Sequence, residues 1–307
     1  MPPSISVAIP TRNAGNGFRE VLDKIRIQIG VGEVEIVVVD SDSSDQTREI
    51  AVNTGAKVYK IERKDFNHGG TRNFAISKTN GEVIALLTQD ALPENEHWLY
   101  ALVNAVLDNP DVSGAYSRQI PQVNAPFWVR QQMEEHGVLS EEKRVQYLKE
   151  DDSFGAMSPM QRVQLCTFDN VSSAIRREAW EEHPFPKVLF AEDIEWARGE
   201  IMRGHKLVYQ PDSCVIHSHQ PNPFQEFARV KIAHQRLAGL FDLRLVPSFP
   251  LLVRYGISNM VRLTRGTIQE QPRRWTGVIE APFIAVASTL GQYYGAKLVK
   301  RKHRVKK

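Results

Sequence analysis

The sequence predicts an α/β protein: an open, mostly parallel sheet flanked by helices and followed by a C-terminal helical segment. Short apolar runs alternate with helical patterns over roughly the first 120 residues, which is typical of βα units. Beyond Pro221 helical patterns continue almost to the end of the chain. The 307 residues are 42% hydrophobic and 24% charged, which excludes a disordered or low-complexity chain.

The apolar runs and the helical patterns give the order of the elements. Strands are predicted at residues 5–9, 34–39, 56–61, 83–87, 113–118, 171–175, 207–209 and 215–216. Helices are predicted at residues 17–29, 45–53, 71–78, 94–108, 129–137, 177–182 and 192–203. A loop is expected at residues 149–160. Ligands of such sheets bind at the carboxyl ends of the strands, so the polar residues that follow each strand are the candidates for a site.

The charge divides the chain into two parts. Residues 1–222 hold 23 Lys and Arg against 32 Asp and Glu, a net charge of −9, whereas residues 223–307 hold 16 against 4, a net charge of +12. This predicts a domain at residues 1–222 and a basic helical segment at residues 223–307. Nucleic acid is disfavoured as a partner, because the acidic part would repel it and no recognition motif is present.

The basic segment suits the surface of an anionic membrane. Its longest uncharged stretch, residues 281–296, is shorter than the roughly 20 apolar residues that a spanning helix needs. Residues 297–307 include seven Lys or Arg. We therefore expect amphipathic helices and a basic tail to bind anionic lipid, with a solvated tail as the alternative.

Cysteine content and the N-terminus predict a cytosolic protein. Cys166 and Cys214 are too few for a disulfide framework, which fits a reducing compartment. The first residues have neither the basic patch nor the apolar run of a signal peptide. With the basic segment, this gives an expected location in the cytoplasm, peripheral at the inner face of the cell membrane.

Acidic residues follow two of the predicted strands. Asp40 and Asp42 come at the end of the second strand, where a carboxylate can accept hydrogen bonds from a ribose or a base. Asp90 follows the strand at residues 83–87 and offers a ligand for a divalent cation. Helix capping is the alternative explanation for acids at such positions.

Three further segments carry chemistry. Glu192 and Asp193 open a predicted helix, where a carboxylate can be held as a general base, although the helix dipole alone also favours acids there. His217 and His219 follow a strand; if the strand continued they would point to opposite faces, so one of them is the candidate metal ligand. Residues 66–73 form a glycine-containing helix entry at which His68 and Arg72 could contact phosphate or sugar oxygens.

Together these segments resemble the family 2 glycosyltransferases of the GT-A fold, a Rossmann-like fold of nucleotide-diphospho-sugar transferases. The resemblance covers about residues 5–219. Its markers appear in order: Val7 to Asn13, Val37 to Asp45, Gly70 to Asn73, Thr88-Gln89-Asp90 as the D-x-D site, Glu192-Asp193, and His217. Within the family, residues 66–73 and 89–91 look most like bacterial rhamnosyltransferases that build surface polysaccharides.

The resemblance implies a role for each matching residue. Asp193 would be the catalytic base that deprotonates an acceptor hydroxyl, giving inversion in one displacement. Asp90 would bind Mg²⁺ or Mn²⁺, with His217 as a further ligand of the metal or the diphosphate. The nucleotide sugar would be held by a larger set: Pro10, Thr11, Arg12, Asn13, Asp40, Asp42, His68, Arg72, Asn73, Gln89, Asp90 and Glu192. Thr88 departs from the family pattern, because an acid usually stands there, so the metal would be weakly held or dispensable.

By analogy with these relatives, the donor is dTDP-L-rhamnose and the acceptor is a lipid-linked glycan or polysaccharide in cell-surface glycan synthesis. UDP and GDP sugars are alternative donors. A non-catalytic carbohydrate-binding or scaffold protein is an alternative that Thr88 favours. A nucleotide-dependent oxidoreductase is disfavoured, because Pro10 to Asn13 stands where a glycine fingerprint would follow the first strand.

Overall fold

The computed structural model describes residues 3–150, 152–270 and 275–299, which form two compact units. The first, here the sheet unit, runs to Gln122 and includes His136–Phe154 and Leu165–His217. The second, here the helical unit, comprises Val123–Glu135, Gly155–Gln164 and the chain from Ser218. The last basic residues of the predicted tail, 300–307, lie outside the described residues.

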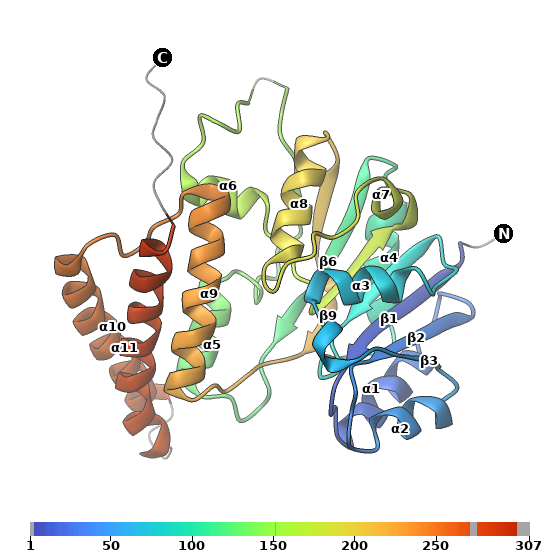
Figure 1. Ribbon diagram of the computed structural model, residues 1–307, viewed down its shortest axis with the longest axis horizontal. Helices are drawn as coiled ribbons and strands as arrows, with labels where there is room; N and C mark the ends of the chain where they lie inside the picture. Colours follow the sequence, from blue (N-terminus) through green and yellow to red (C-terminus); the bar gives the residue numbers. More distant parts are fainter. Residues whose placement is uncertain (1–2, 151, 271–274, 300–307) are drawn as a thin grey trace. The chain divides into compact units, whose positions relative to one another are not determined.

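A nine-stranded sheet forms the core of the sheet unit (Figure 1). In spatial order the strands are β3 (Lys57–Lys60), β2 (Val34–Asp40), β1 (Ile5–Thr11), β4 (Val83–Leu87), β8 (Ser172–Arg176), β6 (Val112–Ile120), β9 (Lys206–Ile216) and β5 (Leu92–Pro93), with β7 (Arg144–Gln146) also paired to β9. Among the described strands six run in one direction, and β8, β5 and β7 oppose them. The predicted mostly parallel sheet is confirmed.

Helices cover both faces of this sheet. Their bounds are α1 (Gly17–Arg26), α2 (Thr47–Asn53) and α4 (Trp98–Leu107) on one face, and α3 (His68–Ile76), α7 (Arg177–Glu182) and α8 (Glu192–Met202) on the other, with a short 3-10 turn at Arg63–Asp65. Successive strand residues point to opposite faces. Val7 and Ile9 therefore pack with the α1 and α4 side, whereas Ala8 packs with the α3 and α8 side.

Some elements begin or end away from their predicted positions, and each difference has a local cause. Helix α3 begins three residues early because the Asn67 side chain accepts a hydrogen bond from the Gly70 amide and caps the helix. The two predicted runs at 207–209 and 215–216 are one strand, β9, whose register against β6 shifts between Ser117 and Arg118.

The helical unit is built from α5 (Phe127–Glu135), α9 (Pro223–Phe241), α10 (Phe249–Glu270) and α11 (Trp275–Lys297), and α6 (Pro159–Leu165) begins in it. Figure 1 shows α9, α10 and α11 side by side. Small residues let α9 and α11 approach closely: a Cβ on Gly295 would lie 2.5 Å from the Lys231 carbonyl oxygen. No described helix is long and apolar enough to cross a membrane.

The predicted boundary at residue 222 differs from the observed units. Helix α5, predicted to lie in the first domain, packs in the helical unit because Phe127 and Trp128 join a buried cluster with Leu263 and Ile284. The buried carboxylate of Glu226 also belongs to this unit, where it accepts a hydrogen bond from the Gln132 amide. An amphipathic stretch alone shows that one face is buried and does not identify its partner.

The two cysteines are free and lie inside the sheet unit. Burial raises the pKa of the Cys166 thiol and that of the Cys214 thiol to about 12 each. Both behave as small apolar side chains of the interior.

A close backbone contact fixes the start of α3. A Cβ on Gly69 would lie 1.9 Å from the Pro186 carbonyl oxygen, whereas a Cβ on Gly70 would come no nearer than 3.4 Å to any neighbour. The segment before α8 therefore lies directly against the first turn of α3.

We predict that Gly69→Ala lowers the free energy of unfolding by about 1–3 kcal/mol, because Pro186 or the helix must move. Gly70→Ala is the matched control; it should be neutral or stabilise by up to about 1 kcal/mol through helix propensity. Chemical denaturation of both variants measures the difference, and equal effects would contradict a specific contact at Gly69.

Candidate functional site

The carboxyl ends of the parallel strands gather most of the predicted site residues at one edge of the sheet. Thr11 and Asp40 are partners in the last pair of the β1 and β2 ladder, and Asp90 lies three residues after β4. Because β8 runs antiparallel to β4, the residues before it, Asp169 and Asn170, reach the same edge. The edge is therefore lined by strand ends and by one strand start.

Asp40 is fully buried at this edge. Its carboxylate accepts hydrogen bonds from the Ser43 amide at 3.0 Å and the Thr11 hydroxyl at 3.3 Å, and from the Ser43 hydroxyl. Arg48 completes the surroundings, with its Nε 3.6 Å from an Asp40 oxygen. The carboxylate that was predicted to contact the nucleotide thus organises the loop after β2, and Thr11 shares that role.

The loop after β2 holds Asn13, an exposed residue of the edge, by hydrogen bonds. The Ser43 hydroxyl accepts a hydrogen bond from the Asn13 amide at 2.8 Å, and the Asn13 side chain accepts one from the Ser44 amide at 2.8 Å. Asn13 and Asp42 both adopt positive φ angles, 46° and 62°, which few residues other than glycine adopt. A hydrogen bond from Lys60 lowers the pKa of the exposed Asp42 carboxyl.

Gln89 joins two of the predicted segments. Its carboxamide accepts a hydrogen bond from the Arg12 amide at 2.7 Å and donates one to the Arg12 carbonyl at 3.1 Å. The loop after β1 is therefore fixed to the loop after β4. Pro10 lies one residue before the end of β1, opposite Val39, and its ring helps to fix the backbone there.

Arg72 and Glu192 form a buried ion pair between α3 and α8. The Arg72 Nη1 atom lies 2.6 Å from a Glu192 oxygen, and both side chains are less than a tenth exposed. Asn73 is equally engaged, because its side chain donates to the Phe185 carbonyl and accepts from the Phe185 amide and from Trp180. Arg72, Glu192 and Asn73, all predicted to hold the donor, are thus shown in contact with protein partners.

His68 is the first residue of α3. Its ring packs edge-on against Phe66, with centroids 5.0 Å apart. Burial of the ring lowers its pKa, although the Glu192 carboxylate opposes the shift. The imidazole is therefore biased towards its neutral form, which can accept as well as donate a hydrogen bond.

Asp193 lies in the first turn of α8, directly after Glu192. Ala191, the residue before the helix, has a positive φ of 59°. The Asp193 carboxylate accepts hydrogen bonds from the Ile194 amide at 2.8 Å and the Asn170 amide at 3.4 Å. Burial, followed by the charges of Glu192 and Asp169, raises the pKa of Asp193 well above its ordinary value. Such a carboxyl group can accept a proton from a substrate hydroxyl.

Asp90, His217 and His219 form a candidate cation site. One ligand atom of each lies within 4.8 Å of the others, and the His217 Nε2 atom is 3.7 Å from an Asp90 oxygen. Strand β9 ends at Ile216, so the opposite-face geometry expected for a continuing strand does not apply to the two histidines. The Thr88 hydroxyl nearby is buried and has no partner among the described residues. One carboxylate and two imidazoles are a donor set that suits a divalent cation.

Gln119 fixes the orientation of His217. The His217 Nδ1 atom is 3.1 Å from the Gln119 carboxamide oxygen, and the Gln119 amide donates to Asp169 at 2.6 Å. Because that oxygen can only accept, Nδ1 carries a proton, and Nε2 is the ring nitrogen that faces Asp90. A chain of contacts thus connects Asp90, His217, Gln119 and Asp169, and Asp169 acts electrostatically on Asp193.

Sequence reasoning missed Gln119, Asp169 and Asn170. Gln119 lies inside β6, one residue before its end, where strand alternation turns a side chain to either face. Asp169 and Asn170 precede a strand, and residues before a strand reach this edge only when that strand runs antiparallel to its neighbours. The polar pair Asp169-Asn170 between Phe168 and Val171 was the available signal, once the antiparallel direction of β8 is known.

Sequence comparison identifies close relatives of the chain. The O-antigen chain rhamnosyltransferase RfbN of Salmonella typhimurium is 34% identical over 230 residues, which cover 73% of this chain and 69% of the relative. The O-antigen chain rhamnosyltransferase WbaN of Salmonella anatum is 30% identical over 232 residues, covering 74% and 70%.

Solved structures share the fold. The mannosyltransferase PcManGT from Pyrobaculum calidifontis, in complex with GDP-Man and Mn²⁺, superposes with a TM-score of 0.60 at 19% identity and covers 94% of this chain and 87% of its own. Glucosyl-3-phosphoglycerate synthase from Mycobacterium tuberculosis, with Mn²⁺, UDP-glucose and phosphoglyceric acid, has a TM-score of 0.54 at 16% identity, with coverage of 77% and 79%. The fold is therefore GT-A, as the resemblance implied.

The family follows from a match that spans more than half of the chain. Residues 6–167 match Glycosyl transferase family 2, which includes β1 to β4, the loop after β2 and Asp90. The two rhamnosyltransferases are similar over a longer stretch. An oxidoreductase and a non-catalytic scaffold are set aside, and the chain is a glycosyltransferase that belongs to family 2.

Proposed function

We propose that the protein transfers L-rhamnose from dTDP-L-rhamnose to a hydroxyl group of a lipid-linked glycan, with inversion, during the synthesis of a cell-surface polysaccharide. The observation that carries the proposal is the desolvated Asp193 carboxylate at the sheet edge that also holds the Asp90 and His217 pair. The two Salmonella relatives support rhamnose as the sugar. The acceptor and the donor nucleotide are part of the proposal.

The donor nucleotide is proposed to bind at the exposed residues of the β1 and β2 loops. Arg12, Asn13 and Asp42 face solvent there, and their backbone is fixed by Gln89 and by the buried Asp40. A preorganised loop binds its ligand with little loss of conformational entropy. In this proposal Asp40 and Thr11 act by holding the loop, and the exposed side chains contact the base and ribose.

Asp90 and His217, with His219 as a third candidate, are proposed to hold Mg²⁺ or Mn²⁺. The bound cation would act as a Lewis acid that stabilises the leaving diphosphate. Gln119 holds the His217 ring so that Nε2 faces Asp90, and thus selects the tautomer that can ligate a metal. Thr88 in place of an acid leaves the site with a single carboxylate, so modest affinity is expected.

Asp193 is proposed to accept the proton of the acceptor hydroxyl as that oxygen attacks the anomeric carbon. The Ile194 and Asn170 amides orient its carboxylate. Burial is the largest cause of its raised proton affinity, and the negative charges of Glu192 and Asp169 raise that affinity further. The glycosidic bond forms on one face of the sugar while the bond to the diphosphate breaks on the other. No covalent enzyme intermediate is needed.

The location is proposed to be the cytoplasmic face of the membrane, where a lipid-linked acceptor would be found. The net charge of +12 in residues 223–307 supports contact with anionic lipid, although the tail residues 300–307 lie outside the described structure.

We predict that Asp193→Asn lowers kcat by about 10²–10⁴-fold, the usual contribution of a general base, while dTDP binding persists. Because the folded-state pKa of Asp193 is raised, wild-type stability falls as pH rises from about 4, the unfolded value, through the folded value. Asn cannot ionise, so Tm at neutral pH should increase in the variant, and the difference should vanish at low pH. Glu195→Gln, two residues along α8, is the control; near wild-type turnover in Asp193→Asn would contradict the assignment.

We predict that Gln119→Leu weakens Mn²⁺ binding by about 10–100-fold, because His217 loses the group that fixes its tautomer. Calorimetric titration with Mn²⁺ in the absence of nucleotide measures this directly. Gln28→Leu replaces another buried glutamine, whose side chain contacts Lys24, Asn95 and Leu99 away from the cation site, and should leave the affinity unchanged. Equal Mn²⁺ affinities of the Gln119→Leu and Gln28→Leu variants would show that Gln119 supports the fold and does not contribute to metal binding.

A panel of nucleotides tests the donor. Thermal shift and calorimetry with dTDP, UDP and GDP and their sugars, each with and without Mn²⁺, should show selective, metal-enhanced binding of dTDP and dTDP-rhamnose. A ligand at 100 times its Kd stabilises the folded state by about 2.7 kcal/mol. Preference for UDP or GDP sugars would overturn the rhamnose assignment.

A further inference from the structure

Helix α10 carries a row of exposed apolar side chains along one face. They recur at intervals of four and seven residues, which places them on one side of a helix. The row consists of Phe249, Val253, Ile257, Val261 and Ile268, all at least 47% exposed. Elsewhere on the helix Leu263 is buried and joins the cluster with Trp128 and Ile284. Helix α10 therefore packs within the protein through Leu263, while the row of large apolar side chains faces solvent.

Helix α11 carries a matching row. Trp275, Ile279, Phe283 and Val286 follow one another at three- and four-residue intervals, and Trp275 is 74% exposed. Between them, small residues such as Ala281 and Ala285 are buried. Helix α11 thus presents these four large apolar side chains to solvent, although Ile284 of the same helix is buried.

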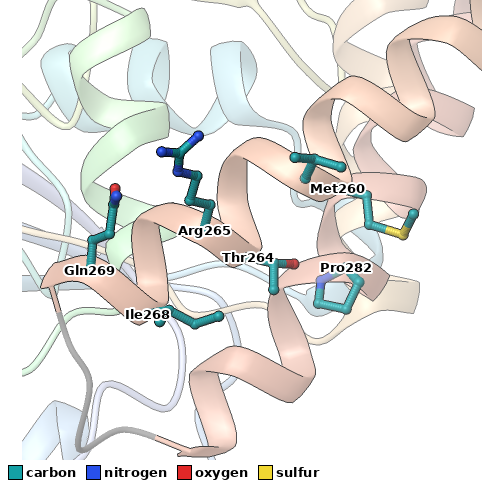
Figure 2. Close-up of a pocket in the computed structure, with 7 residues that line it drawn as sticks. Met260, Thr264, Arg265, Ile268, Gln269 and Pro282 are labelled. Atoms are coloured by element: carbon teal, nitrogen blue, oxygen red, sulfur yellow. The ribbon is translucent and has the colours of Figure 1, made fainter.

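The two rows adjoin. A shallow pocket on α10 is lined by Met260, Val261, Thr264 and Ile268, and Pro282 of α11 closes it. Figure 2 shows Thr264 next to Pro282, with Ile268 one turn further along α10. We call the surface formed by both rows and this pocket the α10–α11 face. Exposed apolar side chains gathered on one surface mark an interaction site.

Cationic side chains border the α10–α11 face. Arg254 and Arg265 lie on α10 beside the apolar row, and Arg265 also lines the pocket. Neither forms an ion pair with an acid of the described residues, whereas Arg262, on another side of the helix, pairs with Glu135. The edge of the face therefore offers guanidinium groups to an anionic partner.

The charge distinguishes a lipid surface from a second copy of the chain. Two copies docked through this face would bring together segments of net charge +12 each, which repel one another. An anionic membrane attracts the same charge, and apolar rows with bordering arginines are the pattern of helices that lie in the plane of a membrane. The helices of the described residues are not apolar enough to span it.

We propose that the α10–α11 face inserts into the headgroup boundary of an anionic bilayer, with Arg254 and Arg265 contacting lipid phosphates. The proposal rests on the proposed function in one respect: a lipid-linked acceptor gives the enzyme a reason to bind the bilayer. It assigns membrane contact to helices of the described structure in addition to the basic tail.

The test uses the full chain and vesicles of phosphatidylcholine, with or without 30% phosphatidylglycerol (about a third anionic lipid). Of the five tryptophans, Trp98, Trp128 and Trp196 are fully buried and Trp180 is half-buried, so Trp275 alone is exposed. Insertion should shift the emission of Trp275 to the blue, and brominated lipids should quench it. The Trp275→Phe variant should lose both the emission shift and the quenching, which would identify Trp275 as their source.

Matched double variants separate the face from general hydrophobicity. Ile257→Gln with Phe283→Gln removes one exposed side chain from each helix of the face (55% and 60% exposed), and Ile27→Gln with Val52→Gln removes two of similar exposure from the sheet unit (54% and 60%). The first should lower partition into anionic vesicles at least tenfold, and the second should leave it unchanged. A chain trimmed after Leu298 measures the contribution of the tail.

Three results would overturn the proposal: no change in Trp275 emission on binding, equal partition of the two double variants, or loss of all binding on trimming the tail. Sedimentation in lipid-free buffer could give a fourth. If the wild-type chain is a dimer and the variant with Ile257→Gln and Phe283→Gln is a monomer, the α10–α11 face binds a second copy of the chain. dTDP binding by the same variant reports on the proposed function separately, because it requires no membrane.

Discussion

The buried ion pair between Arg72 and Glu192 is the interaction on which the site most depends. It joins residues 120 positions apart and fixes the middle of α3 to the start of α8, where Asp193 follows directly. Removing one partner of a buried pair leaves an uncompensated charge and typically costs about 3–5 kcal/mol. Gly69 and Asn73, on the same helix, clamp the segment at residues 185–186. The position of Asp193 at the start of α8 is therefore set by contacts with α3.

Strands β1, β2 and β4 were predictable because their sequences are nearly all apolar and are followed by polar residues. That pattern locates the edge at which Asp40 and Asp90 lie. The direction of β8 was not predictable, since a short apolar run has the same composition whether it runs parallel or antiparallel. Asp169 and Asn170 therefore came to the site unforeseen, and Gln119 with them. The C-terminal helices were predicted as helices, but their buried and exposed faces depend on α5, a partner from the middle of the chain.

Asp40 illustrates how far residue type constrains a role. Its position at a strand end marks it as important, yet its carboxylate is directed into the protein, where Thr11 and Ser43 surround it. The Ser43 hydroxyl in turn accepts a hydrogen bond from the Asn13 amide. A single hydroxyl group therefore couples the conformation of the loop after β2 to that of the loop after β1. The position of an acid at a strand end therefore does not show whether its carboxylate faces solvent or organises a loop, and the hydrogen-bond network distinguishes the two cases.

The burial of both cysteines has a practical consequence for spectroscopy. With thiol pKa values of about 12, Cys166 and Cys214 carry almost no thiolate at neutral pH, and neither is accessible to a reagent. A cysteine introduced at an exposed position would then be the reactive thiol of the folded protein. The wild-type chain is therefore already suited to site-specific attachment of a fluorophore or spin label, without prior removal of its own sulfhydryl groups.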